Sequence, residues 1–278
     1  MKPLFFLFFL ASSLPSYSFS LIPSESSIST EYSLKESGKD LSTAMNWLLK
    51  SSYTQFSSPA VWAYLGASLP VMAYSFHHDK KIYQKYINHT QSSADKINES
   101  LAIISTFPFL NYGFYHYGKK NKDLKMIQFS LELFATTYLA SLESMLISFI
   151  HIHDRPDSSN LNFFETTFRG SSSFTSGHVV PMMALTLKTY QFYGPLASII
   201  PLSLAIWHGK ERVVNRKHYL SDITGAFILT AMASEGVRVQ AKGYQYAHPL
   251  YKLFFGKNHQ VRLQIQHGHK ALAFHYSY

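Results

Sequence analysis

The sequence contains no cysteine, so it has neither a disulfide framework nor thiolate metal ligands, and it carries no signal of redox compartment. Acidic residues are also scarce. Only 16 Asp and Glu stand against 25 Lys and Arg, which gives a formal net charge of +9. The chain shows no nucleic-acid recognition motif and no single basic helix, so this charge does not indicate nucleic-acid binding. The basic residues instead lie between apolar stretches, a distribution that suits an anionic surface or anionic small molecules.

Long apolar runs are lacking as well, because the mean hydropathy of -0.05 is low for a polytopic membrane protein. Three stretches nevertheless contain no Asp, Glu, Lys or Arg: residues 51–78, 102–118 and 189–209. Each is long enough to cross, or nearly cross, a hydrocarbon core of about 30 Å. They also contain Ser, Thr, Tyr, His, Asn and Pro. Buried helices of a soluble bundle and a bundle half sunk in a membrane both fit this pattern, and the number of crossings stays open.

The N-terminus has the features of a secretory signal peptide. Lys2 precedes the apolar run 4–11, and small and polar residues follow through Ser20. We expect cleavage near Ser18 or Ser20, with an uncleaved anchor as the alternative. Residues 1–20 are thus predicted to be a signal peptide and the polar residues 21–40 a flexible lead-in. Export to the periplasm or cell envelope follows from this prediction, with any active site facing the periplasm.

Residues 41–240 are expected to form a helical domain and residues 241–278 a C-terminal extension. In the extension, apolar residues alternate with polar ones on both sides of His267-Gly268-His269. Alternation of period two around a short turn is typical of a β-hairpin. We therefore expect a hairpin that packs on the bundle.

Three short clusters in the second half of the chain carry the chemistry. The third begins at Arg212 and continues through His218 and Asp222 into the apolar stretch 223–233, which is expected to be a buried helix. If His218 lies in the first turn, Asp222 is four residues on and on the same face. A carboxylate there fixes the imidazole tautomer and leaves the other ring nitrogen as a nucleophile.

The other two clusters supply anion-binding groups. Ser176-Gly177-His178 leads into 179–187, which has helical composition, and the N–H groups at a helix start bind phosphate readily. His178 would stand beside that anion, where it can protonate a departing oxygen. Arg155-Pro156 ends the apolar segment 126–153, which is expected to be helical, so the Arg155 guanidinium can reach two phosphate oxygens from the helix end.

Together these residues resemble the type 2 phosphatidic acid phosphatase family, whose helical fold is shared with the vanadium-dependent haloperoxidases. The family pattern is a Lys seven residues before Arg-Pro, then Pro-Ser-Gly-His, then Ser-Arg, five residues, His, three residues and Asp. Arg-Pro, Ser-Gly-His, Arg, His and Asp match in order and internal spacing over residues 142–236. The resemblance implies an all-α helical bundle of this type.

The resemblance also implies a role for each matching residue. His218 attacks phosphorus to form a phosphohistidine, Asp222 orients it, and His178 protonates the leaving alkoxide. Four groups then hold the equatorial oxygens: Arg155, Arg212, Ser176 and the Gly177 amide. No metal or other cofactor is implied. The His151-Ile152-His153-Asp154 run does not change this, because residues two apart on a helix point in nearly opposite directions.

Three positions depart from the pattern: the Lys is Ser148, the Pro before Ser-Gly-His is Thr175, and the Ser before Arg212 is Glu211. Loss of the lysine matters most, since one oxyanion donor typically contributes about 3 kcal/mol to lowering the barrier. His151, one helical turn before Arg155, and Ser148 itself are the candidate substitute donors. A slow enzyme and an inactive relative both fit these departures.

The sequence therefore predicts an exported, metal-independent phosphatase of the acid phosphatase or lipid phosphate phosphatase type. Its substrate is a phosphomonoester or pyrophosphate, expected to belong to a lipid at a membrane surface, although a small soluble phosphoester also fits. Two alternatives remain open: a catalytically weak or inactive anion-binding envelope protein, and a vanadate-dependent haloperoxidase with His218 as the vanadate ligand.

Overall fold

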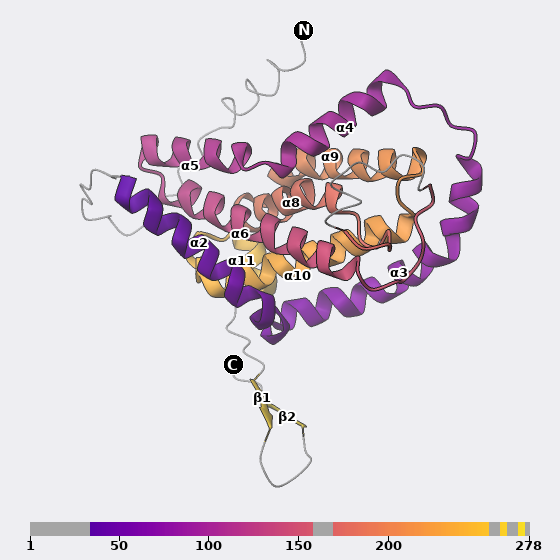
Figure 1. Cartoon of the computed structure of the whole chain (residues 1–278). Helices are drawn as coiled ribbons and strands as arrows, with labels where there is room; N and C mark the ends of the chain where they lie inside the picture. The colour runs from indigo at the N-terminus through magenta and orange to yellow at the C-terminus, as the bar shows by residue number, and fades with distance from the viewer. Residues whose placement is uncertain (1–33, 158–168, 256–261, 266–271, 276–278) are drawn as a thin grey trace. The chain divides into compact units, whose positions relative to one another are not determined.

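A computed structural model describes residues 34–157, 169–255, 262–265 and 272–275. The expected signal peptide and the first part of the expected lead-in lie outside these residues. The chain is a bundle of helices (Figure 1), which confirms the all-α class. The longer helices are α2 (Leu34–Thr54), α3 (Pro59–Lys85), α4 (Ser93–Thr106), α5 (Phe109–Asn121), α6 (Leu124–Ile147), α8 (Val180–Tyr193), α9 (Pro195–Val214) and α10 (Leu220–Ala241).

Shorter elements connect or follow these helices. They are η1 (Gln55–Ser57), η2 (Gly177–Val179), η3 (Gly243–Tyr246) and α11 (Pro249–Phe255). Two strands, β1 (Arg262–Ile265) and β2 (Leu272–His275), pair antiparallel with Leu263 opposite Phe274. The residues between the strands, 266–271, lie outside the described residues. The hairpin as a whole, including its expected turn, therefore stays a prediction.

Helix α10 lies at the centre of the bundle and packs against α2, α3, α6 and α8. Its core-facing residues include Ile223, Ala226, Ala233 and Val237, which join Leu139 of α6 in one buried apolar cluster. The two alanines let neighbouring helices approach closely, and the start of α10 is packed between these helices. Helices α8 and α9 are consecutive in the sequence and pack against each other. This packing fixes the elements on which the sequence motifs lie.

Each of the three stretches without charge is broken in the structure. Pro59 begins α3 after η1, Pro108 separates α4 from α5, and Gly194 ends α8 before Pro195 begins α9. Proline cannot donate a helical hydrogen bond, and Gly194 adopts a φ of 89° that favours glycine. None of the stretches is thus one continuous helix. Among the described helices, none is both long enough and apolar enough to cross a membrane.

Two expected boundaries need correction. Helix α2 begins at Leu34, so the helical region starts inside the expected 21–40 lead-in. Asp40 anchors this helix to α5, because it accepts a hydrogen bond from Tyr115 (2.7 Å) and forms an ion pair with Lys119 (2.8 Å). Helix α6 ends at Ile147 rather than near His153. The Ser148 hydroxyl donates to the Met145 carbonyl at 2.6 Å and accepts from the Gly170 amide at 2.9 Å, which turns the chain out of the helix.

Candidate active site

The centre of the candidate site is His218, which lies just before α10 rather than in its first turn. The amides of Lys217 and His218 both donate to the Arg212 carbonyl, at 2.9 and 3.2 Å, so the chain reverses tightly between α9 and α10. Asp222 at the third position of α10 accepts from the Tyr219 amide at 2.9 Å. This places the Asp222 carboxylate at the helix N-terminus, where negative charge is favoured.

Asp222 and His218 form the expected pair. His218 Nδ1 is 3.1 Å from Asp222 Oδ2, and both side chains are buried. Burial alone would raise the pKa of Asp222, but its contacts with His153 and His218 hold that pKa well below the usual range. The ionised carboxylate can only accept, so Nδ1 of His218 carries the proton and Nε2 has its lone pair available. This is the arrangement of a nucleophile with an orienting carboxylate.

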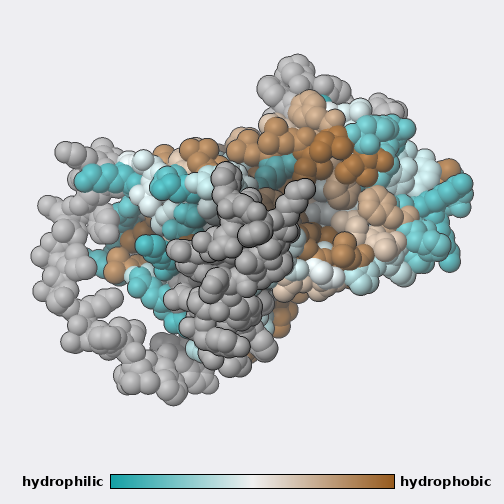
Figure 2. Space-filling view, turned by 90° about the horizontal axis from the view of Figure 1, so that it is seen from below, coloured by the Kyte–Doolittle hydropathy of each residue, from teal (hydrophilic) through white to brown (hydrophobic). Residues whose placement is uncertain are grey.

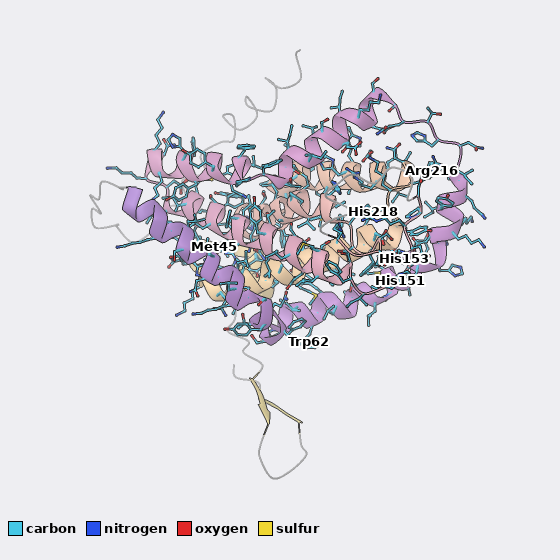
Figure 3. The ribbon with its side chains drawn as sticks, in the orientation of Figure 1. Met45, Trp62, His151, His153, Arg216 and His218 are labelled. Atoms are coloured by element: carbon cyan, nitrogen blue, oxygen red, sulfur yellow. The ribbon has the colours of Figure 1, made fainter. Side chains whose placement is uncertain are left out.

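A second imidazole, which the sequence reasoning did not place here, also contacts Asp222. His153 Nε2 lies 3.2 Å from Asp222 Oδ1, and His153 Nδ1 is 2.9 Å from the Ser173 hydroxyl. Burial alone would lower the pKa of His153, but the Asp222 carboxylate outweighs this effect and raises it. Figure 3 shows His153 and His218 in the same region of the bundle. Asp222 is therefore shared between two rings.

The Ser-Gly-His segment reaches the site as expected. The Ser176 amide donates to the Asp222 carbonyl at 3.2 Å, which ties the segment to the start of α10. Gly177 begins η2, and α8 follows at Val180. The Ser176 side chain makes no capping bond, so its hydroxyl is not used by the helix. Burial, and next the Arg212 charge, lower the pKa of His178 well below its usual value. His178 is thus a neutral ring close to Arg212.

Arg212 lies in the last turn of α9 and is 1% exposed. Arg212 is therefore not part of a solvated basic surface. Glu211 Oε2 is 3.5 Å from Arg212 Nε, and Glu99 Oε1 of α4 is 3.6 Å from Arg212 Nη1. Burial raises the pKa of Glu211. Two carboxyl groups therefore lie at ion-pair distance from the Arg212 guanidinium and offset part of its charge.

Several buried polar atoms around His218 have no hydrogen-bond partner among the described residues. They are Ser176 Oγ, His178 Nδ1, Arg212 Nη2 and His218 Nε2. Buried polar groups are usually paired, so a set of unpaired ones in one neighbourhood indicates a ligand-binding site. Two of these groups are a hydroxyl and a guanidinium nitrogen, which bind anionic oxygens. The set suits an anion with several oxygens.

Arg155 and the two substitute donors differ in placement. Arg155 is partly buried in the irregular segment after α6, and its charge is among those that lower the pKa of His218, after burial. Ser148 is fully buried, and its hydroxyl is engaged by Met145 and Gly170. The His151 side chain is 60% exposed and contacts Asp154 at 3.8 Å. His151 is not on a helix with Arg155, because α6 has already ended, and its exposure does not support a role as substitute donor.

The structure also adds two residues that the motifs do not contain. Asp79 of α3 accepts from the Ser221 amide at 3.0 Å and so caps the first turn of α10. Arg169, outside every motif, donates from Nη2 to the Thr175 carbonyl at 2.5 Å. Neither has a fixed spacing from the motif residues, so no sequence signal identified them. Among the described residues, no group of three or more His, Asp or Glu is arranged to hold a metal ion.

Residues 130–242 match the family model described as the PAP2 superfamily. The matched segment contains all the motif residues from Ser148 to Asp222. The resemblance inferred from the motifs is confirmed for this segment, and the match is consistent with a type 2 phosphatidic acid phosphatase. The match relates this segment to phosphatase- and haloperoxidase-type proteins. Members of this superfamily are generally phosphatases, whose substrates are phosphoesters. No curated protein and no solved structure matches the chain significantly.

Proposed function

We propose, from the PAP2 superfamily match of residues 130–242, that this protein is a metal-independent phosphatase that works through a phosphohistidine. One observation carries the proposal: His218 is buried with Nδ1 on Asp222, while Nε2 is unpaired beside Arg212, Ser176 and His178. A helical bundle of the phosphatase and haloperoxidase type is part of the same proposal.

In this mechanism Nε2 of His218 attacks phosphorus and the bond from phosphorus to the ester oxygen breaks. His178 gives its proton to the leaving alkoxide. A water molecule then attacks the phosphohistidine and gives a proton to His178, the phosphorus–nitrogen bond breaks, and inorganic phosphate leaves. Arg155, Arg212, Ser176 and the Gly177 amide hold the equatorial oxygens, which supplies the fixed positive charge on which phosphoryl transfer mostly depends.

His178 needs a proton before it can act as the acid. In the free protein its pKa is lowered by burial and by Arg212. A bound phosphate ester brings negative charge to the same place and offsets that of Arg212, which favours the protonated ring. Substrate binding and protonation of His178 are therefore coupled in this proposal.

Two surface features support a lipid substrate. Many large apolar side chains are exposed, among them Leu196, Ile199, Ile200 and Ile206 of α9. A mainly apolar cavity of about 620 Å³ lies between α3, α9 and α10, with Lys85 and Lys210 among its lining residues. Figure 2 shows hydrophobic residues gathered in patches on the face it presents. Together with the N-terminal sequence, these features lead us to propose a lipid phosphate substrate at the periplasmic side of the cell envelope.

The decisive experiment compares the wild-type protein with His218→Ala. Hydrolysis of p-nitrophenyl phosphate, and of phosphatidic acid in detergent, is measured with EDTA present. We expect hydrolysis by the wild type and a loss of several orders of magnitude in the variant, because the nucleophile is gone. Equal rates in the two proteins would exclude the mechanism. Trapping of a labelled phosphohistidine by acid quench in the wild type alone would support it directly.

One alternative has its own structural support. Glu211 and Glu99 offset the charge of Arg212, and Ser148 stands where the family pattern has a lysine. The candidate anion site is therefore less positive than the family pattern implies. An anion-binding protein without turnover fits these facts. It predicts orthovanadate binding by the wild type with no hydrolysis of either substrate. Peroxide-dependent bromination in the presence of vanadate would instead identify a haloperoxidase.

A further inference from the structure

The guanidinium of Arg169 lies against the Ser-Gly-His turn. Arg169 Nη2 donates to the Thr175 carbonyl at 2.5 Å and is 3.4 Å from the Ser144 hydroxyl. A Cβ atom on Gly177 would be only 2.9 Å from Arg169 Nη1. A side chain at position 177 would therefore shift the guanidinium from its present place. The guanidinium is thus fixed beside the amide that is expected to hold a phosphate oxygen.

The polar groups that position Arg169 are themselves buried and paired. The Ser144 hydroxyl donates to the Thr175 carbonyl at 3.0 Å and accepts from the Thr175 hydroxyl at 2.9 Å. Both side chains are at most 1% exposed. A side chain held by buried, fully bonded neighbours keeps its geometry when a ligand arrives.

Ser148 brings the segment that carries Arg169 close to the site. The Gly170 amide donates to the Ser148 hydroxyl at 2.9 Å, and the Ser172 amide donates to the Ser148 carbonyl at 3.2 Å. The approach is so close that a Cβ atom on Gly170 would be 2.1 Å from the Ser148 carbonyl oxygen. Arg169 is the residue directly before this contact. The position that lacks the family's lysine therefore anchors an arginine.

The charge of Arg169 reaches both catalytic imidazoles. After burial, which is the main cause, Arg169 is among the charges that lower the pKa of His178 and of His218. An arginine on the surface, screened by water, would not act on both rings. Its field thus covers the space in which the transferring phosphoryl group would lie.

We propose that Arg169 is a third arginine of the anion site and binds a phosphoryl oxygen together with Arg155 and Arg212. It supplies the fixed positive charge that Ser148 does not, with Ser144 and Thr175 as its positioning residues. This inference rests on the proposed phosphatase function for its kinetic consequences. A planar guanidinium that is always charged suits this task, since it stabilises anionic oxygens without a change of protonation.

The test removes the charge with Arg169→Gln and retains it with Arg169→Lys. Lys80→Gln, which removes one exposed cation from α3, is the matched control. We expect Arg169→Gln to lower kcat by about 100-fold or more, the usual effect of losing one oxyanion donor. Arg169→Lys should fall between that variant and the wild type, and Lys80→Gln should match the wild type. Orthovanadate inhibition should weaken at least about tenfold in Arg169→Gln for the same reason.

Two readouts separate this role from a purely structural one. Thermal unfolding of each variant shows whether the fold is intact, and the orthovanadate inhibition constant reports the anion site in the folded fraction. A folded Arg169→Gln protein with wild-type kcat and wild-type vanadate inhibition would overturn the proposal. So would Arg169→Lys and Arg169→Gln variants that lose vanadate affinity to the same extent while both remain folded, because charge would then not be the property that matters.

The outcome is distinguishable from failure of the phosphatase proposal. If the wild type hydrolyses nothing, orthovanadate binding measured by calorimetry still compares Arg169→Gln with the wild type. Weaker binding in the variant would support Arg169 as an anion ligand in a protein without turnover. If His218→Ala abolishes hydrolysis but Arg169→Gln keeps full activity, the phosphatase proposal stands and this inference is wrong.

Discussion

At the scale of single residues, Asp222 determines which atom of His218 reacts. Its two oxygens face two imidazoles, with Oδ2 3.1 Å from His218 Nδ1 and Oδ1 3.2 Å from His153 Nε2. Because both contacts lower the pKa of Asp222 against the effect of burial, the carboxylate stays ionised across the physiological range. An ionised carboxylate fixes the tautomer of His218, so Nε2 is the ring nitrogen that faces the unpaired arginine and serine atoms.

The pKa directions of the two imidazoles predict an acidic pH optimum. Burial lowers the pKa of His218, although Asp222 opposes this, and burial and Arg212 lower that of His178. A lowered pKa means that each ring loses its proton at lower pH than a free imidazole, whose pKa is about 6.5. As the pH rises, His218 loses its proton and becomes a nucleophile before the pH reaches the pKa of free imidazole. His178 likewise loses the proton that it needs as an acid before the pH reaches that pKa. We expect kcat/KM for p-nitrophenyl phosphate to peak below about pH 6.5.

The measurement is kcat/KM between about pH 4 and pH 8, where both limbs of the profile report free-enzyme groups. Lys80→Gln serves as the control and should leave both limbs in place. A peak at or above pH 7.5 would show that the imidazoles are not the groups that titrate. A second control is the pH dependence of inhibition by phenyl phosphonate, whose own ionisation differs from that of the ester. Limbs at the same pH in both profiles would belong to the protein and not to the substrate.

Sequence reasoning found the residues that have a fixed spacing and missed those that do not. His218 and Asp222 are four apart, and Ser176, Gly177 and His178 are consecutive, so local geometry alone brings each set together. Arg169 and His153 reach the site from irregular segments, and Asp79 reaches it from another helix. Their distances to the motif residues are set by tertiary packing, which a single sequence does not display.

At the scale of helices, a buried charge cluster joins α6, α8 and α10. Glu132 Oε2 lies 3.0 Å from Lys188 Nζ and 3.3 Å from Arg238 Nε, and all three side chains are fully buried. Lys188 also donates to Gln191 and to the Ser234 carbonyl. Burial lowers the pKa of Lys188 to about 8. Glu132 thus pairs with two buried cations and joins three helices, and the buried Glu235 carboxylate also acts on Lys188.

We predict that Glu132→Gln strongly destabilises the fold. The amide keeps the shape of the side chain but removes the carboxylate at ion-pair distance from Lys188 and Arg238, and loss of one partner of a buried ion pair typically costs about 3–5 kcal/mol. The free energy of unfolding, measured by urea titration at pH 7.5 with circular dichroism, should fall by about that amount. A change below about 1 kcal/mol would contradict the role of this cluster.

Glu143→Gln is the matched control, because it makes the same substitution on the same helix. Glu143 accepts from the Gln55 side chain at 2.5 Å, and burial raises its pKa to about 7. Since its folded pKa is above its unfolded value, the ionised form is disfavoured in the folded state, and this cost is present above pH 7 and absent below about pH 4.5. At pH 7.5 we therefore expect Glu143→Gln to leave the free energy of unfolding unchanged or to raise it.

Helix identity was predictable, whereas helix ends were less so. The apolar stretch 223–233 does lie in a buried helix, but α10 extends from Leu220 to Ala241 on both sides of it. Helix α6 ends at Ile147, nine residues before Pro156, because Ser148 binds Gly170, a contact between segments about 20 residues apart in sequence. Apolar periodicity reports which face is buried; it does not report the side-chain bonds that end a helix.

At the scale of the whole molecule, the exposed apolar side chains bear on where the substrate is met. Helices α4 and α9 contact each other, and each carries several of them: Ile97, Leu101, Ile103 and Ile104 on α4, and Leu196, Ile199, Ile200 and Ile206 on α9. Large exposed apolar patches usually mark contacts with proteins or membranes. The net charge of +9 adds attraction to anionic headgroups, worth about 1 kcal/mol for each basic residue near the surface.

We predict that the protein binds vesicles and that Leu196→Asp with Ile200→Asp weakens this binding. Leu196 is 82% exposed and Ile200 is 50% exposed. Each buried aliphatic side chain contributes about 1.5–3 kcal/mol at most, so the double variant should bind vesicles of neutral and anionic phospholipid at least about tenfold more weakly. Co-sedimentation measures the bound fraction, and Leu250→Asp on α11, 44% exposed, is the control.

The same variant separates membrane contact from catalysis. Leu196 and Arg212 lie near opposite ends of α9, roughly 24 Å apart at 1.5 Å per residue, so the substitutions do not reach the anion site. Hydrolysis of soluble p-nitrophenyl phosphate should therefore be unchanged, while hydrolysis of phosphatidic acid in vesicles falls in parallel with binding. Equal loss on both substrates would indicate damage to the fold. Full activity on the vesicle substrate would show that this face does not meet the lipid surface, and the small soluble phosphoester would then be the better substrate assignment.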